Sequence, residues 1–105
     1  MPKFIAITPA TTIKKGRVKP FSVGGHNLLI ANVEGRYYAM EDRCSHEDSP
    51  LSLGCLKGEL IDCTLHGSRF NVKTGIPVEE PAVEPVKTFR VRIKDDMIEI
   101  ELGNL

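Results

Sequence analysis

The chain of 105 residues has no tryptophan, two tyrosines and four phenylalanines, and it also lacks long apolar runs. No stretch approaches the roughly 18 consecutive apolar residues of a membrane span, and the first twenty residues contain no apolar core of a signal peptide. We therefore expect a cytoplasmic protein that does not enter a membrane.

The formal net charge is zero, because the chain has fourteen basic and fourteen acidic side chains. General binders of nucleic acid or of membrane surfaces usually carry a marked positive excess, so neither is expected as a partner. The two signs are unevenly distributed, since residues 1–20 carry basic side chains and no acid. Acidic residues instead gather around position 44, namely Glu41, Asp42, Glu47 and Asp48.

Length and patterning predict one all-β domain over residues 1–105. Short runs rich in β-branched and aromatic residues, several of them alternating apolar with polar, occur at 17–23, 26–33, 36–41, 59–63, 69–72, 88–94 and 97–102. Turn residues separate them at Glu34-Gly35, Lys57-Gly58, Lys73-Thr74-Gly75 and Asp95-Asp96, where we expect hairpins. Short strands at this spacing favour an antiparallel sandwich or a small barrel.

Cysteine and histidine are scarce, with three of each, yet two of each fall in the short motifs "CSH" and "CTLH". In a reducing compartment such residues are more often metal ligands than disulfide partners. The expected strands place Cys44 and His46 in a loop after one strand and Cys63 and His66 at the tip of a hairpin. Two loops held by strands can face each other and bind a metal.

Each motif pairs one cysteine with one histidine, and this pairing bears on whether the site holds zinc or an iron-sulfur cluster. Structural zinc sites usually draw adjacent ligands of one type, from C-x(2–4)-C and H-x(3–5)-H pairs. A [2Fe-2S] cluster has two irons, so each loop can give its cysteine to one iron and its histidine to the other. A zinc-stabilised binding module remains an alternative, as does an incidental occurrence of four unrelated residues.

The two motifs resemble the boxes of the Rieske family, C-x-H and C-x-x-H, and the similarity extends from about Leu28 to Leu102. It implies a Rieske-type fold with a cluster-binding subdomain of two hairpin loops, at about 42–50 and 63–68, and one [2Fe-2S] cluster. The implied ligands are Cys44, Cys63, His46 and His66. Ser68 and Pro81 are implied to lie against the cluster, whereas Cys55, outside both boxes, is expected to be a small hydrophobic residue.

Ser49 and Leu65 occupy the positions at which respiratory Rieske proteins carry an additional cysteine in each box. The sequence is therefore more similar to the small ferredoxins of bacterial multicomponent oxygenases. This resemblance implies a monomeric one-electron carrier, not itself an enzyme, between an NAD(P)H-dependent flavoprotein reductase and a terminal oxygenase that hydroxylates aromatic rings. The Rieske-like small subunit of an assimilatory nitrite reductase is the alternative within the family.

Overall fold

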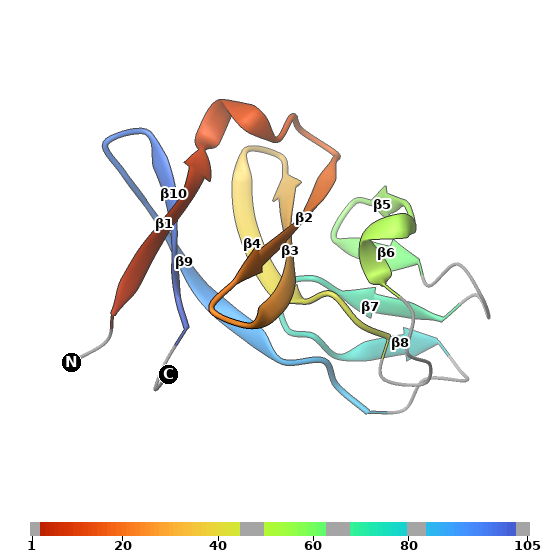
Figure 1. The fold of residues 1–105 in the computed structure, drawn as a ribbon. Coiled ribbons are helices and arrows are strands. Elements are labelled where there is room, and N and C mark those ends of the chain that lie inside the picture. The colour runs from red at the N-terminus through yellow and green to blue at the C-terminus, as the bar shows by residue number, and fades with distance from the viewer. Residues whose placement is uncertain (1–2, 45–49, 63–67, 80–83, 103–105) are drawn as a thin grey trace.

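The computed structural model describes residues 3–44, 50–62, 68–79 and 84–102 (Figure 1). It confirms the all-β prediction, because the described chain forms strands and two short 3-10 helices. The elements in order are β1 (Phe4–Pro9), η1 (Ala10–Thr12), β2 (Val18–Val23), β3 (His26–Val33), β4 (Arg36–Glu41), η2 (Leu51–Leu53), β5 (Leu56–Lys57), β6 (Leu60–Asp62), β7 (Arg69–Asn71), β8 (Pro77–Glu79), β9 (Thr88–Lys94) and β10 (Met97–Glu101). No helix in these ranges is long and apolar enough to cross a membrane.

The strands form two antiparallel sheets that lie side by side (Figure 1). The larger has six strands in the order β1-β10-β9-β4-β3-β2 and curls into a half-barrel. The smaller has four strands in the order β5-β6-β7-β8, and all of them come from the stretch between β4 and β9. The smaller sheet is therefore an insertion into the larger one.

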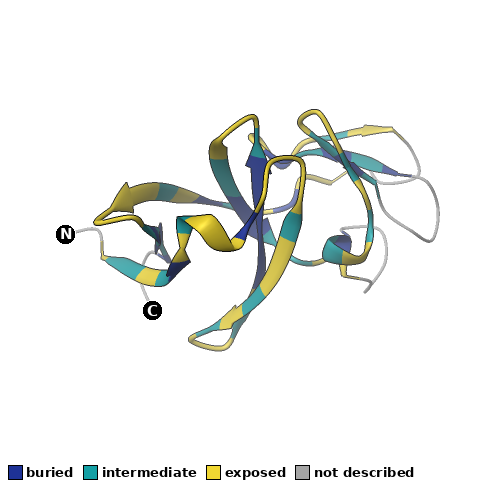
Figure 2. Ribbon diagram, turned by 90° about the horizontal axis from the view of Figure 1, so that it is seen from above, coloured by how far each residue is buried: buried dark blue, intermediate teal, exposed yellow. Residues whose placement is uncertain are grey.

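The protein has two hydrophobic cores, and β3 contributes side chains to both because successive side chains on a strand point to opposite faces. Leu28 and Ile30 pack in a buried cluster with Ile98 and Ile100 of β10. Leu29 and Ala31 pack in a second cluster that includes Ile61 of β6 and Phe70 of β7. Figure 2 shows the buried residues concentrated on these central strands. Each fully buried Leu or Ile contributes about 1.5–3 kcal/mol, so the second cluster joins the two sheets firmly.

All four expected hairpins are present, at β3–β4, β5–β6, β7–β8 and β9–β10. Glu34 and Gly35 have φ of 56° and 90°, and Asp95 and Asp96 have 52° and 62°, as tight hairpin turns require. The antiparallel pairing of β2 with β3 at Gly24-Gly25 was not predicted.

Three strands lie outside the ranges expected from the pattern: β1, β5 and β8. Strand β1 pairs with β10, with Ile5 opposite Ile100, and so forms an edge of the larger sheet. Strands β5 and β8 are two and three residues long, too short for an alternating pattern to register. Both are edges of the smaller sheet, where Pro77 at the start of β8 is tolerated.

Candidate metal centre

Two of the residues predicted to contact a metal group lie in the described chain, and both are buried. Cys44 follows β4 with 1% of its surface exposed, and Ser68 precedes β7 with none exposed. His46, Cys63, His66 and Pro81 lie outside the described residues. Cys55, which was expected to be a small hydrophobic residue outside both motifs, lies exposed between η2 and β5.

The residues that flank the second motif lie at one end of the smaller sheet. Asp62 ends β6, Arg69 begins β7, and the two are paired across the sheet. The strands on either side of residues 63–67 are therefore paired antiparallel, as the sequence predicted. Glu79 ends β8 and is paired with Arg69 from the other side. The segments 63–67 and 80–83 therefore both join the sheet at the same end.

The first motif is connected to the smaller sheet through the hydrophobic core. Cys44 belongs to the cluster of buried side chains that contains Leu51 of η2, Ile61 of β6 and Phe70 of β7. Thus the cysteine of the first motif is packed with the two strands that carry the second.

Gly54 brings the chain after the first motif into contact with the chain before the second. A Cβ atom built at Gly54 would lie 1.7 Å from the carbonyl oxygen of Asp62, a distance that no side chain can occupy. One residue further on, the Cys55 carbonyl accepts a hydrogen bond of 3.1 Å from the Asp62 backbone N–H. Backbone contacts therefore hold the chain that follows the first motif against the chain that precedes the second.

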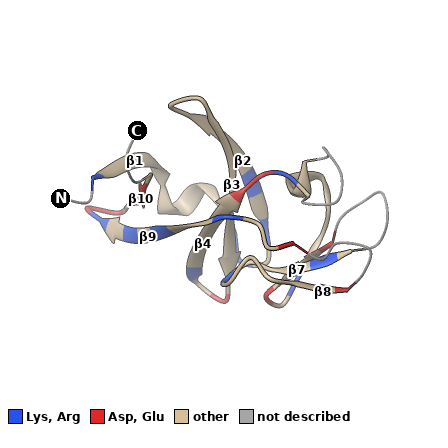
Figure 3. Cartoon of the chain, turned by 90° about the horizontal axis from the view of Figure 1, so that it is seen from below, with Lys and Arg blue, Asp and Glu red and all other residues tan. Residues whose placement is uncertain are grey.

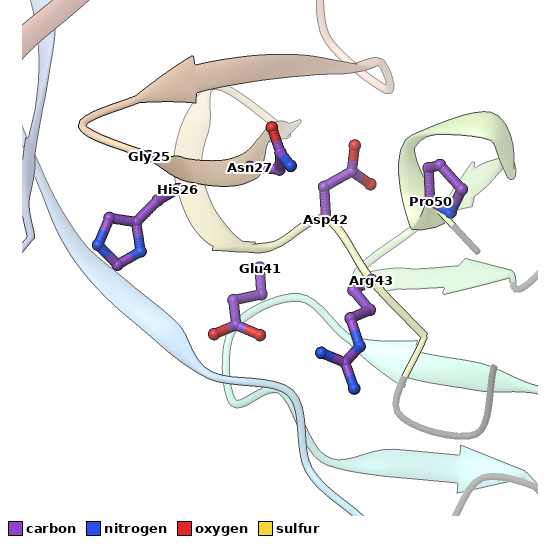
Figure 4. Close-up of a pocket in the computed structure, with 7 residues that line it drawn as sticks. All are labelled: Gly25, His26, Asn27, Glu41, Asp42, Arg43 and Pro50. Carbon is purple, nitrogen blue, oxygen red and sulfur yellow. The ribbon is translucent and has the colours of Figure 1, made fainter. Parts of the chain in front are cut away.

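A surface cavity of about 420 Å³ lies beside the first motif. Figure 4 shows the side chains of His26, Glu41 and Arg43 directed to the same side, away from those of Asn27 and Asp42. His26 is the first, half-buried residue of β3, with its ring edge-on to Phe89 at a centroid distance of 6.2 Å. No local pattern predicts this contact, because Phe89 lies on β9, far along the chain.

The charge around this end is mixed rather than uniformly acidic. Glu41, Asp42, Glu79 and Glu84 lie in the described chain, but Arg43 and Arg69 lie among them. Figure 3 shows the acidic position at the end of β8 and a basic position on the neighbouring strand β7. The expected acidic excess at this end rests in part on Glu47 and Asp48, which lie outside the described residues.

The described residues fit a metal group with thiolate and imidazole ligands. No three His, Cys, Asp or Glu side chains converge within the described ranges, three of the four expected ligands being outside them. The Cys44 thiol, however, is buried in an apolar cluster, where a bound metal ion is shielded from water. Thiolate sulfur together with imidazole nitrogen suits zinc or an iron-sulfur cluster.

Comparison with known families favours an iron-sulfur cluster over zinc. A family model described as a Rieske [2Fe-2S] domain matches residues 3–90. The ferredoxin component of biphenyl 2,3-dioxygenase from Rhodococcus jostii (strain RHA1) is 38% identical over 87 residues, which cover 83% of this chain and 81% of that one. The ferredoxin component of the naphthalene 1,2-dioxygenase system from Pseudomonas putida is 35% identical over 101 residues, or 96% and 97% of the two chains.

Solved structures of ferredoxins superpose on nearly the whole of this chain. The ferredoxin of carbazole 1,9a-dioxygenase from Nocardioides aromaticivorans IC177 superposes with a TM-score of 0.91 at 28% identity, covering 96% of this chain and 99% of that one. A chain from a complex of reduced oxygenase and oxidized ferredoxin in carbazole 1,9a-dioxygenase gives a TM-score of 0.90 at 31% identity, with coverage of 97% and 95%.

Proposed function

The chain belongs to the Rieske [2Fe-2S] domain family, and from this premise we propose that it delivers single electrons to the terminal oxygenase of a ring-hydroxylating dioxygenase system. It carries one Rieske-type [2Fe-2S] cluster and acts as a ferredoxin, an electron-transfer component rather than a catalyst. The observation that supports the proposed partner most directly is the full-length similarity to the naphthalene dioxygenase ferredoxin component.

The proposed ligands are Cys44 and Cys63 on one iron and His46 and His66 on the other. The buried position of Cys44 supports this assignment, because the thiolate-bound iron of such a pair needs shielding from water. When bound, the cluster supplies a reversible one-electron couple. The protein's own part is to hold the two loops in register, exclude water from the thiolates, and leave the histidine side accessible to a partner.

The electron donor in this proposal is an NAD(P)H-dependent flavoprotein reductase, and the acceptor is the oxygenase α subunit. A monomeric carrier in the cytoplasm, where NAD(P)H is available, fits both roles. The relatives reported above are all ferredoxin components of dioxygenase systems, which favours this assignment over a subunit of nitrite reductase. The substrate is bound by the oxygenase, so the carrier itself does not select the aromatic ring.

The test is electron transfer to an oxygenase encoded by a neighbouring gene. The purified protein is reduced anaerobically by a flavoprotein reductase and NADH, then mixed with the oxidised oxygenase in a stopped-flow spectrometer. We expect a reduced [2Fe-2S] spectrum that reverts as the oxygenase is reduced. A colourless protein without iron and acid-labile sulfide would contradict the cluster, and co-purification with a sirohaem protein would contradict the oxygenase as partner.

A further inference from the structure

Three charged side chains form a row across the end of the smaller sheet from which the second motif and the proline segment leave. Arg69 Nε lies 3.0 Å from Asp62 Oδ1, and Arg69 Nη1 lies 3.3 Å from Glu79 Oε1. The three residues belong to β6, β7 and β8, with Arg69 on the central strand. One guanidinium therefore connects the ends of three strands.

A bulge in β8 creates this row. Phe70 is paired with Pro77, but Arg69 is paired with Glu79, so that Val78 is an extra residue in β8. Without the bulge Val78 would lie opposite Arg69, and no second carboxylate would be available. Bulges are common beside functional sites, where they redirect a side chain. Here the redirected side chain is a carboxylate directly before segment 80–83.

The position of Arg69 on its strand is fixed by its neighbours. Ser68 and Phe70 on either side are fully buried, so Arg69 projects to the opposite, more exposed face. Its partner atom Asp62 Oδ1 is buried and accepts no well-aligned hydrogen bond in the described part of the chain. Asp62 has a second cation, because Lys57 Nζ lies 3.9 Å from its other oxygen, Oδ2. The guanidinium is the nearer of the two, and its removal leaves the buried Oδ1 without a cation in direct contact.

We infer that Arg69 is a positioning residue for the cluster-binding loops, an inference that rests on the proposed ligand assignment. Through Asp62 and its own backbone it fixes both ends of segment 63–67, which carries Cys63 and His66. Through Glu79 it fixes the start of segment 80–83, which carries Pro81. Because a planar guanidinium engages two carboxylates at once, it holds the second motif and the proline segment in one relative position.

Arg69→Gln tests the inference, with Arg92→Gln as the matched control. Arg92 also makes a cross-strand ion pair, with its Nε 2.6 Å from Glu99 Oε1, but on β9 and β10 of the larger sheet. Both variants keep all four proposed ligands and should be purified with the cluster. Three properties of the holoproteins are measured: the rate at which visible absorption bleaches in moderate urea, the electron paramagnetic resonance g-values of the reduced protein, and the reduction potential.

We expect Arg69→Gln to bleach about fivefold faster than the wild type and to show shifted or broadened g-values, whereas Arg92→Gln matches the wild type. Arg69→Lys should restore only part of the difference, because an ammonium cannot pair with both carboxylates in this geometry.

Glu79→Gln separates positioning from charge. A purely electrostatic role for the row moves the reduction potential down in Arg69→Gln and up in Glu79→Gln, without faster bleaching in either. Positioning makes both variants bleach faster. Wild-type bleaching rates and g-values in Arg69→Gln, or equal changes in Arg92→Gln, would overturn the inference. Absence of a cluster from the wild-type protein would instead contradict the proposed function.

Discussion

Both carboxylate oxygens of Asp42 lie 2.6 Å from Ser52, one accepting from its backbone N–H and the other from its hydroxyl. Asp42 comes shortly before Cys44, and Ser52 lies in η2, so the pair closes the loop that contains the first motif. Hydrogen bonds to an ionised carboxylate are stronger than neutral ones, and this one is part-buried. The loop is thus closed by side-chain bonding as well as by core packing of Cys44.

Asp42→Asn and Ser52→Ala are expected to destabilise the protein by about 1–3 kcal/mol, because each weakens or removes charge-assisted hydrogen bonds. Urea titration followed by far-UV circular dichroism measures the free energy of unfolding. Ser22→Ala is the control, since Ser22 also donates a 2.6 Å hydrogen bond, to Asn27 Oδ1, but at an exposed site. Equal losses in Ser22→Ala and Ser52→Ala would show that closing the first loop has no special importance.

Replacing any one proposed ligand should abolish the cluster. We expect Cys44→Ser, His46→Ala, Cys63→Ser and His66→Ala to give colourless, poorly folded protein, because metal binding and folding are coupled. Cys55→Ser is the matched control, and its exposed position supports the expectation that it retains full iron and sulfide. Iron and acid-labile sulfide are measured in all five variants. A complete cluster in any of the four ligand variants would disprove the assignment.

The sequence predicted the all-β class and four hairpins because Gly and Asp at turns and alternation in strands are local signals. It missed the edge strand β1 and also β5 and β8, and these last two are set by pairing with neighbours rather than by pattern. At the candidate site it identified the motifs but not the contacts that join them. Gly54 against the Asp62 carbonyl and Arg69 between two carboxylates depend on register across strands, including a bulge that no local pattern reveals.

Electron transfer to the oxygenase should slow as salt increases, if acidic residues beside the motifs guide docking. Glu41 lines the cavity next to the first motif, and Glu84 follows the proline segment. Glu41→Gln should lower the second-order rate constant about two- to fivefold at low ionic strength and much less at high ionic strength. Glu34→Gln, at the exposed β3–β4 turn, is the control. Rates that do not change with salt would indicate that these side chains are only solvated.

The reduction potential should lie in the lower part of the range of about −150 to +300 mV that Rieske centres span, below about 0 mV. High-potential members resemble one another in having hydroxyl donors two and four residues after the second histidine, positions held here by Ser68 and Phe70. Both residues are fully buried, so a hydroxyl at either position acts in a low-dielectric environment. Phenylalanine has no hydroxyl, which leaves the reduced state with less stabilisation.

Voltammetry on the wild type, Phe70→Tyr and Ser68→Ala tests this expectation. Phe70→Tyr should raise the potential by about 40 mV, the equivalent of roughly 1 kcal/mol for a one-electron couple, and Ser68→Ala should lower it by a similar amount. Because Phe70 packs in the core with Cys44 and Ile61, the free energy of unfolding is measured in parallel, to separate a new hydrogen bond from disturbed packing. A wild-type potential above about +150 mV would place the protein with the respiratory class and overturn its assignment as a carrier supplied by a flavoprotein.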